Sequence, residues 1–212
     1  RLLKENAEHT GDDKKYRMLD AFEQAYLVCR NIENFNRLGG YSKHIPGRSK
    51  WKQSLEICRY VNQLMEELAD VDLMEADDDE DMRFLGKLVK RYLELQERNM
   101  AMDFSTIQTK TYDMLMRHPE ILEKVRDKIR YIMVDEYQDT NYIQEQLVFL
   151  LAGDRKNICV VGDDDQGMYR FRGATIRNIL EFPGKFEAGE CSVIHLDDNY
   201  RSEPGIIEFY NI

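Results

Sequence analysis

The chain has 212 residues, of which 42% are hydrophobic, and its formal net charge at pH 7 is −10. This length is enough for one large hydrophobic core or two modest ones, and the apolar share excludes a disordered chain. The negative net charge argues against a protein that coats nucleic acid nonspecifically. The charge is uneven, because residues 1–60 contain 12 Lys and Arg against 8 Asp and Glu, whereas residues 61–101 contain 5 against 12. A local basic patch that binds phosphates is therefore compatible with the composition.

The sequence carries no signal for a membrane or for secretion. No apolar run approaches the ~20 residues that a membrane helix needs, and the first residues lack the apolar core of a signal peptide. The four cysteines lie far apart, with no CxxC pair and no His at zinc-ligand spacing, so we expect reduced thiols in a cytoplasmic protein. Since the chain begins at Arg1 rather than Met and stops in an apolar stretch without a helix-stop signal, we also expect a fragment of a longer polypeptide.

From about Lys14 to Ala101 the sequence predicts packed amphipathic helices. The apolar residues recur at spacings of three and four, as in the run from Leu55 to Leu68, and no strand signal interrupts them. Residues 38–50, LGGYSKHIPGRSK, hold three glycines and a proline and predict a loop. A further helix is expected after Asp103, which is a suitable N-cap, and Pro119 favours the start of another.

The acidic stretch EADDDEDM, residues 75–82, has aspartates at positions one, three and five of an EF-hand calcium loop. Position six holds Met82, where Gly is required, and position twelve holds Leu88, where Glu is required. The pattern therefore predicts a solvated loop between two helices.

After Lys128 the pattern changes to alternating strands and helices. The β-rich runs YIMV, ICVV and SVIHL predict strands at residues 131–134, 158–161 and 192–196, and the segments 143–153 and 175–182 between them predict helices. Unbroken apolar strands that alternate with helices indicate a parallel sheet covered on both faces. We therefore expect an all-helical part joined near Met102 to an α/β part.

Two adjacent carboxylates, Asp135 and Glu136, follow the first predicted strand. In parallel α/β sheets, ligands bind beyond the carboxyl ends of the strands. One carboxylate there can hold Mg²⁺ through its waters while the other orients or deprotonates an attacking water, which suits hydrolysis of a phosphoanhydride. Because the chain is 33% charged, the alternative interpretation of this pair is a plain polar loop.

The other two predicted strands also end in polar chemistry. The second leads into Gln166, Tyr169, Phe171 and Arg172; the Gln can hydrogen-bond a γ-phosphate, the rings can stack on bases, and the Arg can pair with the acids of the first strand. The third is followed by Arg201, a residue type suited to phosphate. The alternative interpretations are two core aromatics and a surface arginine.

Three segments together resemble the superfamily 1 DNA helicases of the UvrD/Rep/PcrA type. VDEYQDTN (134–141) is similar to their Walker B motif, VGDDDQGMYRFRGA (161–174) to motif III, and LDDNYRS (196–202) to motif IV, in the same order. MDF (102–104) is similar to the short motif where their chain re-enters the first RecA-like domain. The resemblance extends from about Tyr92 to Asn211, and before that it concerns only the helical architecture.

The resemblance implies ATP and Mg²⁺ as cofactors and a role for each residue that matches a motif. It makes Asp135 the Mg²⁺ carboxylate and Glu136 the base that activates water, and it places Gln166 and Arg201 at the γ-phosphate.

The same resemblance implies the contacts with DNA. Tyr169 and Phe171 would line the single-strand channel, with Phe171 standing where Trp is frequent in the family. Gln138, Asp139 and Arg172 would join the nucleotide site to the DNA site.

A P-loop, which this family needs to hold ATP, is not recognisable in the sequence. Ser42–Ser49 has the spacing but carries Ser for the first Gly and Arg for Lys, and Gly162–Tyr169 has neither Lys nor Ser/Thr at the end. We expect the P-loop upstream of Arg1 and a second RecA-like domain beyond Ile212.

The sequence thus predicts an α/β fold in two parts: a helical 1B-like subdomain at residues 1–101 and the later part of a RecA-like domain 1A at residues 102–212. The expected function is that of an ATP-dependent DNA helicase fragment, acting on single-stranded and duplex DNA in the 3′ to 5′ direction, with the rest of the same polypeptide as its partner. The alternatives are the helicase part of a helicase-nuclease and a nucleic-acid-binding module without catalysis.

Overall fold

The computed structural model describes residues 1–7, 15–163 and 176–210. The first described helices are α1 (Leu2–Glu5), α3 (Ala21–Arg30), η1 (Ile32–Asn34), α4 (Tyr41–His44), α5 (Lys50–Glu66), α6 (Val71–Ala76) and α7 (Glu80–Arg98). The later ones are α8 (Phe104–Arg117), α9 (Pro119–Arg126), η2 (Tyr137–Asp139), α10 (Tyr142–Ala152), η3 (Gly153–Arg155), α11 (Ile176–Glu181), η6 (Phe182–Lys185) and α12 (Pro204–Tyr210). Two parallel pairs of strands accompany them, β1 (Arg17–Met18) with β2 (Ala101–Met102), and β3 (Ile132–Val134) with β4 (Ile158–Val160).

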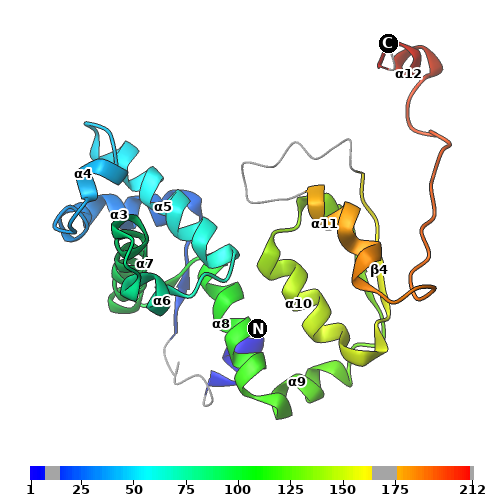
Figure 1. Cartoon of the computed structure of the whole chain (residues 1–212), viewed down its shortest axis with the longest axis horizontal. Coiled ribbons are helices and arrows are strands. Elements are labelled where there is room, and N and C mark those ends of the chain that lie inside the picture. The colour runs from blue at the N-terminus through cyan, green and yellow to red at the C-terminus, as the bar shows by residue number, and fades with distance from the viewer. Residues whose placement is uncertain (8–14, 164–175, 211–212) are drawn as a thin grey trace.

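Figure 1 shows a group of helices, α3 to α7, on one side and the pair β3–β4 with α10 and α11 on the other, with α8 and α9 between them. This arrangement confirms the expected α/β fold class with an all-helical part. None of the described helices combines the length and the apolar character needed to span a membrane.

The helical unit, defined as α3 to α7, has a core of its own. Val28 of α3, Ile57 of α5, and Leu88 and Tyr92 of α7 are fully buried in one cluster. The predicted periodicity is confirmed, because Cys58, Val61 and Met65 of the run that predicted α5 are all buried there. Each turn of these helices thus places an apolar side chain on the shared core.

Aspartates define where these helices begin. Asp20 and Glu23 form a reciprocal capping box at α3, and the Asp79 side chain accepts from the N–H groups of Asp81 and Met82 at the start of α7. The acidic stretch 75–82 therefore holds a helix cap, and the predicted loop between two helices is limited to residues 77–79. The prediction of a loop at 38–50 was wrong in part, because α4 forms within it, with its N-cap Gly40 at φ +86°.

The prediction that no strand interrupts the first hundred residues was also wrong. β1 and β2 pair in parallel, with Arg17 opposite Ala101 and Met18 opposite Met102, and the N–H of Leu19 donates to the carbonyl of Met102 over 2.8 Å. Strands of two residues are too short to produce an alternating pattern in the sequence. They matter for the architecture, because the helical unit begins after β1 and ends before β2, so that the pairing brings its two ends together.

The short helix α1 packs outside the helical unit. Leu2 and Leu3 lie against a cluster formed by Leu115 of α8 and Ile121 and Leu122 of α9. The first residues of the chain therefore pack against the part of the chain that follows β2. The division of the chain into subdomains at residue 101 stays a prediction.

The α/β part contains the two strands and helices that the sequence predicted. β3 and β4 are parallel, with Met133 opposite Cys159, and α10 and α11 lie within the predicted segments 143–153 and 175–182 to one residue. The expectation that helices cover both faces is wrong for this chain, because Met133 is 78% exposed. One face of the pair is bare.

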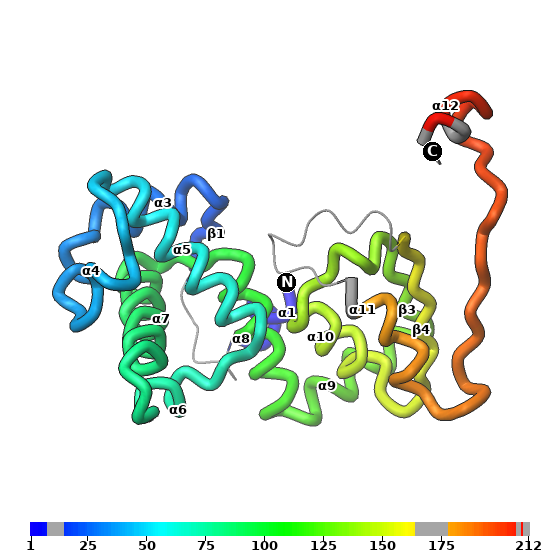
Figure 2. The backbone as a smooth tube through the Cα atoms, turned by 45° about the horizontal axis from the view of Figure 1, so that its top comes forward, coloured from blue at the N-terminus to red at the C-terminus, as the bar shows by residue number. Residues whose placement is uncertain are grey.

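The third predicted strand, residues 192–196, does not form among the described residues. Cys191–Tyr200 has no strand partner, and Leu196 is 85% exposed. A strand is stable only when a neighbour pairs with its backbone groups, and here the segment runs away from β4 towards α12 (Figures 1 and 2). Its β-rich composition is therefore not sufficient to place it in the sheet.

A buried carboxylate joins the helical unit to the rest. Asp103, directly after β2, is 4% exposed, and its Oδ2 accepts from Gln24 Nε2 of α3 over 2.8 Å and from Gln96 Nε2 of α7 over 2.9 Å. The Tyr92 hydroxyl also donates to this oxygen, and Oδ1 accepts from the N–H of Thr106 over 2.8 Å as the cap of α8. Among the described residues, no buried side-chain nitrogen or oxygen lacks a partner. We call these five residues the polar cluster.

Removing the carboxylate should destabilise the chain far more than removing an ordinary helix cap. We expect Asp103→Ala to lower the free energy of unfolding by about 3 kcal/mol, because three buried side-chain donors lose a charged acceptor. Urea unfolding followed by circular dichroism measures this change. The matched control is Asp79→Ala, which removes an exposed cap and should cost about 1 kcal/mol. Equal effects of the two substitutions would contradict a special role for the polar cluster.

Candidate functional site

The carboxyl end of β3 carries two exposed carboxylates in a tight turn. Glu136 has a left-handed backbone conformation, φ 51° and ψ 46°, and immediately precedes η2. The Asp135 Oδ1 atom accepts from the N–H of Glu136 over 3.0 Å. A non-glycine residue in this region of φ and ψ is strained, and such strain is concentrated at functional turns. The turn ends the strand and leaves both carboxylates facing solvent.

Gln138 ties this turn to the end of β4. Its side chain is 2% exposed; Nε2 donates to Glu136 Oε2 over 2.7 Å, and Oε1 accepts from the N–H of Asp163 over 3.1 Å. A Cβ atom at Gly162 would lie 2.6 Å from Gln138 Oε1, so a side chain at Gly162 would displace the amide. The predicted joining residue Gln138 thus lies between the two acidic strand ends.

Backbone bonds continue the strand pairing into the turn. The N–H of Val161 donates to the carbonyl of Val134 over 2.8 Å, and the N–H of Tyr137 donates to the carbonyl of Val161 over 2.9 Å. Asn178 of α11 holds the other end of the turn by donating from Nδ2 to the carbonyl of Thr140 over 3.1 Å. Asp139, another residue predicted to join the nucleotide site to the DNA site, is exposed and lies between the hydrogen-bonded residues Tyr137 and Thr140.

A buried ion pair under the turn was not predicted. Tyr137 donates from its hydroxyl to Glu145 Oε1 over 2.8 Å, and Lys185 of η6 contacts Glu145 Oε2 at 2.5 Å. Burial, followed by the bond to Glu145, raises the pKa of the Tyr137 hydroxyl. The sequence signal for this pair was the lone acid Glu145 in an otherwise apolar helix, but its lysine partner is distant in the chain.

The remaining predicted site residues are not brought to the acidic turn. Arg201 lies exposed between η6 and α12, and its described hydrogen bond is from its own N–H to Asn199 Oδ1 at 2.9 Å. The predictions for Gln166, Tyr169, Phe171 and Arg172 fall outside the described residues.

The donor set at the turn fits a magnesium–nucleotide complex. Mg²⁺ is usually bound by one or two carboxylates together with waters and substrate phosphates. Asp135 can supply one such carboxylate, while Gln138 fixes the orientation of the neighbouring Glu136 without neutralising it.

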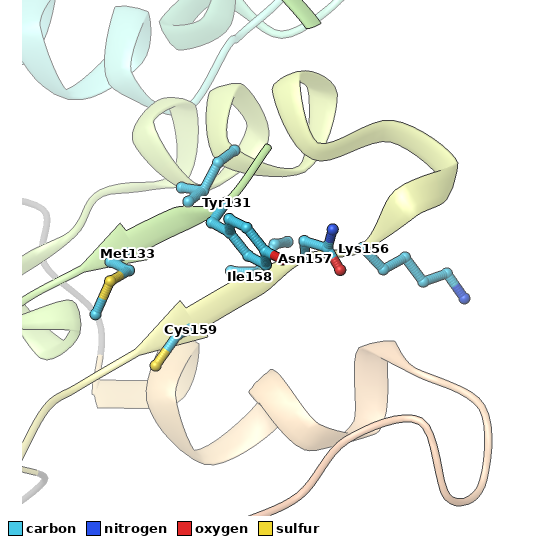
Figure 3. A pocket seen from close by; sticks show the side chains of 7 residues that line it. Tyr131, Met133, Lys156, Asn157, Ile158 and Cys159 are labelled. Atoms are coloured by element: carbon cyan, nitrogen blue, oxygen red, sulfur yellow. The ribbon is translucent and has the colours of Figure 1, made fainter. Parts of the chain in front are cut away.

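A pocket lies at the opposite end of the strands. It has a volume of about 340 Å³ and is lined from Tyr131 to Met133 and from Lys156 to Cys159, as Figure 3 shows. These residues precede the strands or occupy their first two positions, whereas ligands of parallel sheets bind beyond the carboxyl ends. The pocket is therefore part of the bare face and not of the acidic site.

Fold and site together define an α/β protein with a helical insertion and an acidic turn at the carboxyl end of parallel strands. The family model of the UvrD/REP helicase N-terminal domain matches residues 1–187, and the chain belongs to this family. It is 33% identical over 211 residues to the ATP-dependent DNA helicase PcrA of Staphylococcus aureus, and equally to that of Staphylococcus epidermidis. In both comparisons the match covers 100% of this chain and 27% of the relative, so the chain spans about a quarter of the length of these proteins.

Glu66 connects the helical unit to the acidic turn. This last residue of α5 accepts from Ser105 Oγ over 3.0 Å and also interacts with the Asn141 side chain, the cap of α10 that follows η2. Burial raises the pKa of the Glu66 carboxyl, an effect that the bonds to Ser105 and Asn141 oppose. The fold therefore holds the Glu66 proton more tightly than the unfolded chain does.

A carboxyl group whose pKa is raised by folding adds to the free energy of unfolding. This contribution is fully present below the pKa that the group has in the unfolded chain, and it is lost as pH rises through its pKa in the folded chain. Glu66→Gln keeps an acceptor for Ser105 without the buried charge. We expect it to raise the melting temperature at pH 7 by about 2–4 °C, which is the shift that a gain of ~1 kcal/mol in the free energy of unfolding produces in a chain of this size. The gain should shrink towards pH 4.5. Scanning calorimetry across this pH range measures the effect. The exposed neighbour variant Glu67→Gln is the control, and a Glu66→Gln protein that melts lower at pH 7 would refute the expectation.

Proposed function

We propose that this chain is a part of an ATP-dependent DNA helicase, inactive alone, whose β3 turn takes part in ATP hydrolysis in the full-length polypeptide and which contacts DNA. The observation that carries the proposal is the exposed pair Asp135 and Glu136, tied by Gln138 to the end of β4. Family membership supports it, as do the relatives named ATP-dependent DNA helicase PcrA.

In this proposal each acidic side chain has a separate task. Asp135 holds Mg²⁺, which neutralises charge on the phosphates when it is bound. Glu136 accepts a proton from the water that attacks the γ-phosphate. The bond from Gln138 Nε2 to Glu136 Oε2 keeps the carboxylate in one orientation and leaves its other oxygen for that water.

Gln138 also supplies a physical link from nucleotide to DNA. A movement of Glu136 changes the position of the amide, and the amide in turn holds the N–H of Asp163 at the start of motif III. In the proposal, Gln166 and Arg201 contact the γ-phosphate, Tyr169 and Phe171 contact single-stranded DNA, and the whole protein moves 3′ to 5′ and separates duplex DNA. Asp139 and Arg172 complete the joining set.

The bare face of the sheet is the proposed contact with the rest of the polypeptide. Met133 and Cys159 are exposed on neighbouring strands, and the β-rich segment 192–196 has no strand partner among the described residues. A P-loop strand supplied from elsewhere in the longer protein would pair at an edge of this sheet and let residues 192–196 join it, and the helix that follows such a strand would cover the bare face. Arg201 would then come to the same edge as Asp135.

The main test is the substitution Glu136→Gln in the full-length polypeptide. We expect ATP binding to persist and hydrolysis to fall by about 10² to 10⁴, because an amide cannot accept the proton of the attacking water. Steady-state phosphate release with single-stranded DNA present measures the rate. Asp154→Asn, a change of an exposed acid beyond α10, is the control and should hydrolyse normally. Near-normal hydrolysis by Glu136→Gln would exclude Glu136 as the base. Absence of ATPase activity in the full-length wild type would contradict the proposal and favour a nucleic-acid-binding module without catalysis.

The proposed contact of the bare sheet face predicts a change in thiol reactivity. In this chain the exposed Cys159 should react readily with a maleimide reagent, and in the full-length polypeptide it should be protected. Cys58 is the internal control, since it is buried and burial raises the pKa of its thiol to about 12, so that it stays unreactive in both proteins. Mass spectrometry of the labelled peptides separates the two sites. Equal labelling of Cys159 in both proteins would contradict the contact.

A further inference from the structure

Two aromatic rings on α3 face solvent in a stacked arrangement. Phe22 is 65% exposed and Tyr26 is 50% exposed, one helical turn apart, and their ring planes lie 8° from parallel with centroids separated by 6.2 Å. The core contacts of α3 come from another side of the helix, through Ala25 and Val28. The fold therefore does not use these rings for its core.

Helix α5 extends this aromatic surface. The Trp51 ring, which is partly buried against the core, lies 5.4 Å from that of Phe22, and Leu55, one turn further along α5, is 46% exposed. We call Phe22, Tyr26, Trp51 and Leu55 the aromatic surface. A cluster of exposed large apolar side chains of this kind, contributed by two helices, marks an interaction site more often than scattered single residues do.

On each of the two helices, an arginine follows the residues of the aromatic surface. On α3 the spacing of four that joins Phe22 to Tyr26 continues to Arg30, whose guanidinium lies 5.9 Å from the Tyr26 ring centre. On α5 the same spacing leads from Trp51 through Leu55 to Arg59. Arg59 is paired with Glu56, but the Arg59 side chain is 51% exposed, and ion pairs at the surface are weak enough to exchange for another anion. The aromatic surface thus borders on cationic groups.

The distribution of charge favours an anionic partner. Residues 17–60, which contain α3 and α5, hold 8 Lys and Arg against 4 Asp and Glu, whereas residues 61–101, which contain α6 and α7, hold 5 against 12. Figures 1 and 2 show α3 and α6 towards opposite ends of the helical unit. The stretch that carries the aromatic surface is therefore basic in a chain of net charge −10, although its Lys43 pairs with Asp81 of α7.

From these observations we propose that the aromatic surface binds single-stranded nucleic acid, with bases stacked on Phe22 and Tyr26 and the backbone phosphates contacted by Arg30 and Arg59. Stacking accepts any base, because each base offers a flat face, and it requires unpaired bases. The site is additional to the one proposed at Tyr169 and Phe171. It rests on the proposed function only in the choice of DNA as the probe.

The test is the binding of a fluorescein-labelled 20-nucleotide oligo(dT) by this chain, followed by anisotropy at low salt. We expect Phe22→Ala with Tyr26→Ala to raise Kd by about fivefold to 100-fold, which corresponds to losing the stacking of one base. The matched control is Leu73→Ala with Met82→Ala, which removes two exposed apolar side chains from α6 and α7 and should leave Kd unchanged. All of these side chains are partly or largely exposed, so both double variants should melt within about 2 °C of the wild type.

Two further measurements separate the possible partners. Arg30→Gln should weaken the salt dependence of oligo(dT) binding, since one phosphate contact is lost, and a 20-base-pair duplex should bind less tightly than oligo(dT). Unchanged oligo(dT) binding by the Phe22 and Tyr26 double variant would overturn the inference. A loss of self-association in that variant, measured by sedimentation with oligo(dT) binding intact, would overturn it in favour of a protein interface. Neither result would affect the ATPase test of Glu136, so failure here is distinguishable from failure of the proposed function.

Discussion

The structure depends on one buried charge, the carboxylate of Asp103. It accepts from side chains of α3 and α7 and from the backbone of α8, so that one residue fixes the first and last long helices of the helical unit against the helix that follows them. A buried carboxylate is costly unless donors surround it, and this requirement makes the arrangement specific: any displacement of α3 or α7 would leave the charge without partners. The apolar core of the unit gives stability, whereas Asp103 gives it a defined position on the rest of the chain.

This position matters for the acidic turn. Two residues after Asp103, Ser105 contacts Glu66 at the end of α5, and Glu66 also interacts with the cap of α10 directly behind η2. The path from the helical unit to Glu136 thus runs through short polar contacts that join rigid helices. Gln138 and Gly162 extend it to the end of β4. A rearrangement of the helical unit would therefore change the position of the turn that carries the carboxylates.

Local signals in the sequence predicted most of the secondary structure, and long-range pairing accounts for what they missed. The caps at Asp103 and Pro119, the periodicity of α5 and α7 and the runs that form β3 and β4 depend on neighbours within a few residues. The contact of Gln24 with Asp103 joins residues 79 positions apart, and the pair of Glu145 with Lys185 joins residues 40 positions apart; no periodicity encodes such contacts. The strand prediction at 192–196 failed for a related reason, since strand formation needs a partner as well as β-branched residues. At the site, the identities of Asp135, Glu136 and Gln138 came from motif resemblance, but the bridging geometry of Gln138 did not.

The ladder of β1 and β2 has an architectural consequence. Two residue pairs on adjacent strands, about 5 Å apart, join the chain where it enters and leaves the helical unit, in addition to the polar cluster and the contact of Ser105 with Glu66. The two ends of the unit are thus close enough in space for a short linker to replace everything from α3 to α7 while α8 and the sheet keep their chain path. Among the described residues, β3 and β4, which carry the acidic turn, pair with each other and not with β1 or β2, so the length of the chain between β1 and β2 does not set their spacing.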